Sequence, residues 1–426
     1  MRSSNRRPET PKPPGPPVEV VIETIGGEGD GVASGPIYVP FTLPGERVRA
    51  VGSGERRELD AVLTASAQRV TPPCAHFGTC GGCALQHWEH PAYLAWKLDR
   101  LRKTLALQHI ETEILAPFAA KPGTRRRLAL HARPGKRGEA RLGYKGRKSW
   151  DLVDITACPI ADPRLEAALP GLRRLAAPLF EHSKSAPTLH VTVTNEGLDI
   201  DITGVERKSG GLSADARMRV AEAAAEANFA RVTLDGDVAY GVRQPVVRVG
   251  PAVVALPAGA FLQAVPQAEA AMVAFAVAQA AGAERIADLY CGVGTFTFPL
   301  AQIAPVYAVD SHAPAIRALS SAISTAPGLK GISAEARDLA RRPVLAVEFK
   351  KIDTVLFDPP RAGALEQTAE IAASKVARVI GVSCNPATFA RDARVLIDSG
   401  FSLDRVLPVD QFLWSPHIEL VGVFTR

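Results

Sequence analysis

A cysteine and two carboxylates stand at the ends of apolar segments in the second half of the chain. Cys384 follows the apolar run 376–383, Asp358 follows the run 352–357, and Glu419 begins a run that ends near residue 424. A cysteine at a strand end, beside a helix start, can act as a thiolate nucleophile. A carboxylate within hydrogen-bond reach can remove a proton from a reacting carbon. An isolated cysteine would favour a buried structural role, but the Ser-Cys-Asn-Pro and Asp-Pro-Pro-Arg contexts favour chemistry.

A glycine-containing loop precedes these residues. Gly292 and Gly294 follow the apolar run 285–290, and the next apolar run ends at Asp310. Glycines let a ligand approach the backbone closely, and an acid about twenty residues further on suits ribose hydroxyls. A dinucleotide fingerprint needs a third glycine, and Thr297 stands there instead. With the acid before the loop, the pattern indicates an S-adenosylmethionine site.

Four of the six cysteines form a separate group. Cys74, Cys80 and Cys83 are close in sequence, and Cys158 follows much later, whereas Cys291 and Cys384 belong to the motifs above. Four thiolates suit a tetrahedral zinc ion or an iron–sulfur cluster. Structural zinc commonly uses two short Cys pairs, so three local ligands plus a distant one favour a [4Fe–4S] cluster, with zinc as the lesser alternative.

The 426 residues are expected to fold as more than one domain. Residues 1–17 are rich in Pro and Arg and predict a disordered basic tail; short β-branched runs at 18–71 predict a small OB-like barrel. Residues 72–255 predict an α+β central domain, with a helix near 93–109 that packs on the catalytic domain. Alternating helices and apolar strands over 256–426 predict a doubly wound, Rossmann-like α/β sheet.

The chain resembles the RNA uracil-C5 (5-methyluridine) methyltransferases, and its cysteine group resembles their iron–sulfur-containing 23S rRNA branch. The N-terminal barrel resembles the TRAM domain, an RNA-binding module of that family. The segments that carry the resemblance are Asp288–Phe296, Asp358–Gly363, Ser383–Phe389 with Arg391-Asp392, and Asp410–Glu419. The resemblance implies a class I methyltransferase that methylates C5 of a uridine in 23S rRNA.

The resemblance also implies roles for individual residues. Cys384 matches the nucleophile that adds to C6, Glu419 the general base, and Asp358 a position facing the cofactor and target base. The cofactor-binding positions that match are Gln263, Tyr290, Gly292, Asp310 and Asp358. The family commonly has Phe-Phe-Gln-x-Asn, whereas this chain has Leu262 and Val265 at the second and last positions.

Charge and composition indicate the partners. Residues 121–148 carry eleven Lys or Arg and one acid, and Arg125–Arg127 are candidate phosphate contacts. The target uridine must be single-stranded or flipped out to reach a thiolate. The longest uncharged runs, 249–268 and 289–309, contain Pro, Gly and Gln, so we expect no membrane helix. No signal peptide is visible, and we expect a cytoplasmic monomer.

Other functions remain open. The same chemistry on tRNA is one alternative, and a non-catalytic RNA-binding protein of ribosome assembly is another. Amino-group methylation normally places an aromatic after Asp-Pro-Pro, where this chain has Arg361. Cytosine-C5 methylation typically uses two cysteines near the target, but Cys291 lies in the cofactor loop.

Overall fold

The computed structural model describes residues 15–205 and 211–426, so most of the predicted basic tail lies outside the described residues. The chain divides into two compact units. The first joins the residues up to Pro73 with Cys83–Tyr93 and Trp414–Pro416. The second contains Cys74–Gly82, Leu94–Leu413 and His417–Arg426.

The first unit contains a five-stranded antiparallel sheet in the order β3-β2-β1-β4-β5. The strands are β1 (Val18–Ile25), β2 (Gly31–Ala33), β3 (Ile37–Val39), β4 (Arg47–Val51) and β5 (Glu58–Thr64). Ile22, Val39 and Val48 are buried in its small core. Alternate residues of a strand point to opposite faces, so one face of β4 is apolar while Arg47 and Arg49 are exposed. The sheet confirms the predicted N-terminal β-module.

A buried glutamate holds the turn before β4. The Glu46 carboxylate accepts hydrogen bonds from the backbone N–H groups of Leu43 (2.9 Å) and Ser66 (3.2 Å). Arg69 donates two more, through Nε (2.6 Å) and Nη2 (2.8 Å). Burial by itself raises the pKa of Glu46, but these bonds outweigh it and hold the pKa below its usual value.

Residues distant in sequence complete the first unit. The Trp414 carbonyl oxygen accepts hydrogen bonds from the N–H groups of Ala84 (2.9 Å) and Leu85 (3.0 Å). Trp414 itself has a positive φ of 58°, a region that side chains other than glycine rarely occupy. The first unit therefore includes a segment from the last part of the chain.

The second unit begins with a seven-stranded sheet in the order β10-β9-β8-β11-β12-β13-β14. Its strands are β8 (Arg127–Pro134), β9 (Ala140–Lys145), β10 (Leu152–Asp154), β11 (Thr188–Thr194), β12 (Gly197–Thr203), β13 (Arg231–Leu234) and β14 (Asp237–Gly241). Helical segments of this region are η1 (Lys136–Gly138), α2 (Pro163–Ala167), α3 (Leu169–Ala176), η2 (Ala177–Phe180) and α4 (Ala214–Glu226). Leucines of α3 and apolar side chains of β8 and β11 share one core. Only β12 and β13 pair in parallel, so this is the predicted α+β region.

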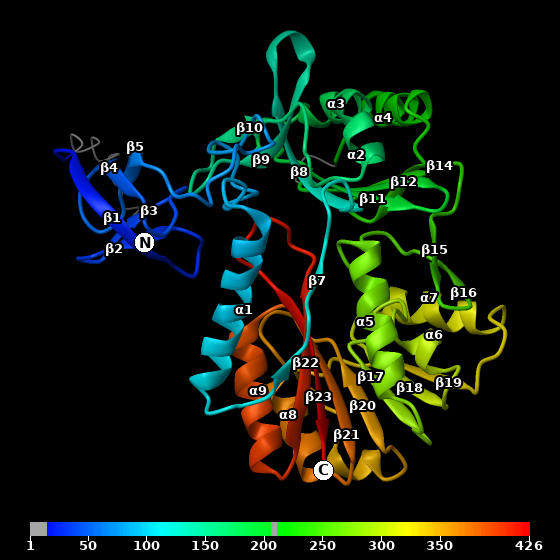
Figure 1. Cartoon of the computed structure of the whole chain (residues 1–426). Coiled ribbons are helices and arrows are strands. Elements are labelled where there is room, and N and C mark those ends of the chain that lie inside the picture. The colour runs from blue at the N-terminus through cyan, green and yellow to red at the C-terminus, as the bar shows by residue number, and fades with distance from the viewer. Residues whose placement is uncertain (1–14, 206–210) are drawn as a thin grey trace, which may run out of the picture. The chain divides into compact units, whose positions relative to one another are not determined.

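A nine-stranded sheet follows, in the order β19-β18-β17-β20-β21-β23-β22-β6, with β7 also paired to β22 (Figure 1). Its strands are β6 (Glu113–Ile114), β7 (Phe118–Ala119), β17 (Ile286–Leu289), β18 (Val306–Asp310), β19 (Ile332–Ala336), β20 (Thr354–Phe357), β21 (Arg378–Ser383), β22 (Ser402–Asp410) and β23 (Glu419–Thr425). The five strands from β19 to β21 are parallel, and β23 is antiparallel to both neighbours. The hairpin β15 (Val246–Val249) and β16 (Ala252–Ala255) precedes this region. The doubly wound α/β prediction is confirmed.

Helices cover both faces of this sheet (Figure 1). They are α1 (His90–Ala106), α5 (Pro266–Gln279), α6 (Thr297–Leu300), α7 (Ala313–Ile323), η3 (Ala346–Phe349), α8 (Leu365–Ala373) and α9 (Pro386–Asp398). Met272 of α5 and Leu319 of α7 pack with Ile286 in one core. Leu101 of α1 and Phe389 of α9 pack in the other, with strand side chains that point the opposite way. Strands covered on both sides are apolar throughout, as β20 is.

A fully buried ion pair anchors the end of β22. Lys97 Nζ of α1 lies 2.6 Å from Asp410 Oδ1 and 3.1 Å from the Phe412 carbonyl oxygen. The other carboxylate oxygen of Asp410 has no hydrogen-bond partner among the described residues. Burial lowers the pKa of Lys97 to about 8, although Asp410 opposes the fall. The start of the segment between β22 and β23 is therefore fixed from α1.

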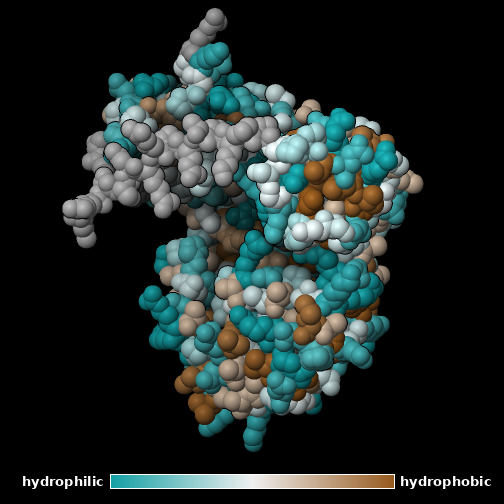
Figure 2. Space-filling view, turned by 90° about the vertical axis from the view of Figure 1, so that its left-hand side faces the viewer, coloured by the Kyte–Doolittle hydropathy of each residue, from teal (hydrophilic) through white to brown (hydrophobic). Residues whose placement is uncertain are grey.

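The described helices include none that is both long enough and apolar enough to cross a membrane. Figure 2 shows hydrophobic side chains in small groups among hydrophilic ones on the lower part of the face in view.

Candidate active site

The loop after β17 has the unusual backbone that its glycines predicted. Tyr290, Gly292 and Gly294 all have positive φ values, of 61°, 54° and 96°. A Cβ on Gly294 would lie 2.8 Å from the Phe298 ring, so only glycine fits there. A Cβ on Gly292 would meet no atom within 4 Å, so the space beside this residue is open. Burial raises the pKa of Tyr290 to about 12, which keeps its hydroxyl neutral.

Three aspartates lie at the carboxyl ends of adjacent parallel strands, around this loop. Asp310 ends β18, and its Oδ2 accepts a hydrogen bond from the Gly292 N–H (2.9 Å). Asp288 of β17 accepts one from the Thr297 hydroxyl at Oδ2 (2.6 Å), while its Oδ1 is buried without a partner among the described residues. Burial raises the pKa of Asp288 to about 7, and the charges of Asp358 and Asp310 add to the rise. Three close carboxylates and a buried orphan acceptor fit a cationic ligand with hydrogen-bond donors.

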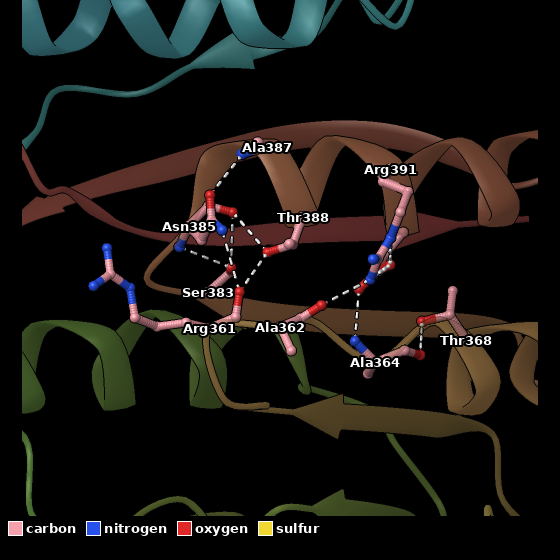
Figure 3. Close-up of polar contacts among 10 residues, drawn as sticks. Arg361, Ala362, Ala364, Thr368, Ser383, Asn385, Ala387, Thr388 and Arg391 are labelled. Atoms are coloured by element: carbon pink, nitrogen blue, oxygen red, sulfur yellow. Dashed lines mark hydrogen bonds and ion pairs between the residues drawn. The ribbon is translucent and has the colours of Figure 1, made fainter. Parts of the chain in front are cut away.

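Two loops that follow β20 and β21 are tied together (Figure 3). Asn385 caps α9 by accepting a hydrogen bond from Ala387 N (3.1 Å), and its Nδ2 donates to the Arg361 carbonyl oxygen (3.1 Å). Further bonds run from Arg391 Nη2 to the Ala362 carbonyl (3.0 Å) and from Ala364 N to Asp392 Oδ2 (2.8 Å). The motifs that follow Asp358 and surround Cys384 therefore form one rigid unit.

Cys384 lies close to three charged side chains, those of Glu419, Arg361 and Asp358. Burial is the main reason that the pKa of its thiol rises to about 11. The Glu419 carboxylate raises that pKa further, Arg361 opposes the rise, and Asp358 adds to it. The structure thus brings the predicted nucleophile, the predicted base and Asp358 together. Without ligands the thiol is protonated at neutral pH, so a nearby positive charge would favour the reactive thiolate.

Two glutamine side chains join the two carboxylates. Gln411 Nε2 donates hydrogen bonds to Glu419 Oε2 (2.7 Å) and to Gln263 Oε1 (2.8 Å). Gln263 Nε2 in turn donates to Asp358 Oδ2 (3.1 Å). Gln411 Oε1 accepts from the Ala264 N–H (3.1 Å), which fixes the orientation of its amide. Burial raises the pKa of both Asp358 and Glu419, and the Asp358 charge adds to the rise at Glu419.

Sequence reasoning missed Gln411. It immediately follows Asp410 at the carboxyl end of β22, and that position was the signal available. Its partner Gln263 was predicted, but from the resemblance alone.

Two of the arginines offered as phosphate contacts support the segment that carries Gln263. Arg126 is buried, pairs with Glu269 (2.5 Å) and donates to the Gln263 carbonyl oxygen (3.0 Å). Arg127 donates to the Leu262 carbonyl oxygen (2.7 Å), and its guanidinium lies 5.1 Å from the centre of the Phe261 ring. The expectation that Arg126 contacts phosphate is therefore corrected, because it is buried and paired with Glu269. Arg127 is only half-buried, and its phosphate contact stays a prediction.

Three of the four predicted metal ligands interact with one another: Cys80 interacts electrostatically with Cys74 and with Cys158. Cys74, Cys80 and Cys158 belong to the second compact unit and Cys83 to the first. Burial raises the pKa of Cys80 and of Cys158, and the Cys80 thiol adds to the effect at Cys158. Across residues 15–205 and 211–426, no three His, Cys, Asp or Glu side chains are placed to hold a metal ion. The [4Fe–4S] cluster therefore stays a prediction.

Comparison with known proteins gives consistent results. The family model of the tRNA (uracil-5-)-methyltransferases matches residues 252–426. An uncharacterized RNA methyltransferase of Caulobacter vibrioides is 66% identical over 96% of this chain and 100% of its own length. The 23S rRNA (uracil(1939)-C(5))-methyltransferase RlmD of Chromohalobacter salexigens is 31% identical, over 95% of this chain and 88% of its own.

A solved structure is similar over nearly the whole chain. The Pyrococcus abyssi tRNA (uracil-54, C5)-methyltransferase, in complex with S-adenosyl-L-homocysteine, aligns with a TM-score of 0.74 and 25% identity. The alignment covers 96% of this chain and 99% of that one. These relatives confirm the resemblance drawn from the strand-end motifs: the chain belongs to the RNA uracil-C5 methyltransferases, a family of enzymes.

Proposed function

We propose that this enzyme methylates C5 of a uridine in 23S ribosomal RNA with S-adenosylmethionine as methyl donor. One observation carries the proposal: Cys384, Asp358 and Glu419 gather at the strand ends, and the two carboxylates are joined through Gln263 and Gln411. The choice of ribosomal RNA is supported by the RlmD relative and by the cysteine pattern.

The residues have separable tasks in this reaction. The Cys384 sulfur bonds to uracil C6, and the electron pair of the C5–C6 double bond moves into an enolate that makes C5 nucleophilic. S-adenosylmethionine, when bound, would supply the methyl group that C5 takes up, and the broken sulfur–methyl bond would leave S-adenosylhomocysteine. Glu419 then takes the C5 proton, the double bond reforms, and the C6–sulfur bond breaks to release Cys384. Gln263 and Gln411 hold the two carboxylates apart and oriented.

The aspartates and the open glycine loop fit the cofactor. Asp310 and Asp358, with the charge of the buried Asp288 beside them, form an anionic surface that suits the sulfonium and ammonium charges. Asp310 lies where an acid can reach a ribose. Tyr290 and the backbone at Gly292 would line the same space. The positive charge of bound S-adenosylmethionine would also favour the Cys384 thiolate. We therefore propose that the methyl donor binds before the thiol reacts.

An RNA carrying 5-fluorouridine tests the proposal. A base cannot remove fluorine from C5, so the Cys384–uracil bond should persist after methyl transfer. A denaturing gel and mass spectrometry should show a covalent enzyme–rRNA species with wild type and none with Cys384→Ala. An adduct on tRNA alone would favour the tRNA alternative, to which the Pyrococcus structure points. No adduct on either RNA would contradict the chemistry and favour a non-catalytic RNA-binding protein.

The remaining proposals concern RNA and metal binding. We propose that the five-stranded module is a TRAM-like contact for RNA, that the uridine is flipped out to reach Cys384, and that the enzyme is a cytoplasmic monomer.

A [4Fe–4S] cluster on Cys74, Cys80, Cys83 and Cys158 is supported by their sequence pattern and the family resemblance, not by their placement. Iron, sulfide and zinc analysis of anaerobically purified protein distinguishes three outcomes: an iron–sulfur cluster, a zinc ion, or no bound metal.

A further inference from the structure

The turn between β9 and β10 presents a tryptophan to solvent. Trp150 is 81% exposed. The turn is well ordered by hydrogen bonds from Gly146 N to the Asp151 carbonyl (2.8 Å) and from Ser149 N to the Gly146 carbonyl (3.1 Å). A ring of this size in water forgoes a large hydrophobic gain, and tryptophan is enriched at binding interfaces. The side chain is therefore a candidate contact residue.

One cation contacts this ring, and others lie close to it in sequence. Lys145 Nζ lies 3.8 Å from the ring centre. The segment 139–151 also contains Arg141, Arg147 and Lys148, with the acids Glu139 and Asp151 at its two ends. Cations follow a phosphate backbone, while the face of an aromatic ring accepts any base by stacking. Protein-binding surfaces are instead depleted of lysine, so this combination favours single-stranded nucleic acid over a protein partner.

The base of the turn is fixed to another segment of the same unit. Gly81 N donates to the Lys145 carbonyl oxygen (3.0 Å), and Cys80 pairs with Gly146 in an isolated β-bridge. A Cβ on Gly81 would lie 2.9 Å from that carbonyl oxygen, so the close approach requires glycine. A preorganised ring loses less conformational freedom on binding than one on a mobile loop.

We propose that Trp150 stacks on an unpaired base of the substrate RNA, outside the active site, while the neighbouring cations hold the adjoining phosphates. This proposal rests on the proposed function only in taking RNA as the substrate. It adds an RNA contact at a residue that neither the motifs nor the relatives' names assign. The stacked base is not the target uridine, because the target itself must reach Cys384.

Three variants of the full-length enzyme test it. Trp150→Ala should weaken binding of a single-stranded rRNA fragment by about 5- to 100-fold, as loss of a base–aromatic stack does. Trp150→Phe should retain most of the affinity. Leu107→Ala is the matched control, since Leu107 is 79% exposed and apolar, and it should bind as wild type does. Binding is measured by fluorescence anisotropy at several salt concentrations, after equal melting temperatures have been verified.

The salt dependence and the kinetics separate stacking from charge. Trp150→Ala should leave the slope of log affinity against log salt unchanged, whereas Lys148→Gln should reduce it by about one. Trp150→Ala should raise KM for RNA and leave kcat at saturating RNA near the wild-type value. Unchanged RNA affinity in Trp150→Ala, or an equal loss in Leu107→Ala, would overturn the proposal and leave this surface to a protein partner.

The 5-fluorouridine adduct keeps this test apart from the proposed function. If wild type forms no adduct but Trp150→Ala still loses RNA affinity, the proposed chemistry fails and the stacking contact stands. If both proteins form the adduct at saturating enzyme and bind RNA equally, the chemistry stands and the stacking contact fails.

Discussion

Two buried glutamates, one in each compact unit, have opposite surroundings. Glu46 is 0% exposed and Glu419 is 3% exposed. Glu46 has the guanidinium of Arg69 and two backbone N–H donors, and its pKa lies below the usual value. Glu419 has one neutral amide from Gln411 and a like charge at Asp358, and burial raises its pKa. Equal burial therefore does not imply an equal role.

The difference shows what a poised carboxylate requires. A carboxylate with a cationic partner and several donors stays ionised and stabilises the fold, but it is a weak base. A carboxylate with a single neutral donor titrates closer to neutral pH, so it can take a proton and give it up again. The first arrangement suits a structural turn, and the second suits the proposed role of Glu419.

The sharpest test exchanges each glutamate for its amide. Glu419→Gln should lower turnover by about 10²- to 10⁴-fold, the usual contribution of a general base, and should leave melting nearly unchanged or slightly higher. Glu46→Gln should lower the free energy of unfolding by about 1.5–3 kcal/mol, because hydrogen bonds to a charged group are lost. The folded Glu46→Gln enzyme should keep its kcat. Single-turnover methylation measures the rate of the reaction, and urea unfolding measures the free energy of unfolding. Similar effects on both quantities in the two variants would contradict the comparison.

A third buried carboxylate, Asp410, tests whether a cationic partner is what makes a buried carboxylate stabilise the fold. Lys97→Met leaves Asp410 buried without its cation and should lower the free energy of unfolding by about 3–5 kcal/mol. Adding Asp410→Asn should recover part of the loss, because the unpaired charge is gone. Urea unfolding of both variants measures the effect. A loss below about 1 kcal/mol in Lys97→Met would mean that the pair contributes little.

The aspartates of the proposed cofactor site extend the comparison to the binding of a charged ligand. Asp288, with a pKa of about 7, and Asp358 lose their charge as the pH falls, so they then attract a cation less. S-adenosylmethionine carries a sulfonium charge that S-adenosylhomocysteine lacks. The affinity ratio of the two should fall by about tenfold between pH 8 and pH 6. Calorimetry on the Cys384→Ala protein measures it, and a constant ratio would contradict the anionic surface.

The smallest expected effect comes from removing the Gln411 amide, the neutral hydrogen-bond donor to Glu419. The Gln411 bond lowers the pKa of Glu419, so Gln411→Leu should raise that pKa further. Since the base must be ionised, the rising limb of kcat/KM against pH should move to higher pH, by less than about one unit. Full-length rRNA methylation across pH measures the shift. An equal fractional loss at every pH would mean that Gln411 only supports the structure.

Much of the site could be predicted because strand ends meet in a doubly wound sheet. Residues after successive apolar runs, such as Asp358 and Cys384, must come close once those runs form parallel neighbours. The Gln411–Gln263 bond could not be predicted, since it joins positions far apart in sequence and depends on side-chain packing. Charge alone also misassigned Arg126, because a count of cations does not tell which guanidinium is buried.

The N-terminal unit depends on a segment that is synthesised late. Trp414 accepts the backbone bonds of Ala84 and Leu85, and Glu419 follows five residues later. Domains usually fold as they leave the ribosome, N-terminal part first. A nascent chain that has not yet reached residue 414 lacks both this closing segment and the proposed base. The first unit therefore acquires this segment only after residues 414–416 have been translated, and the proposed base follows only with residue 419.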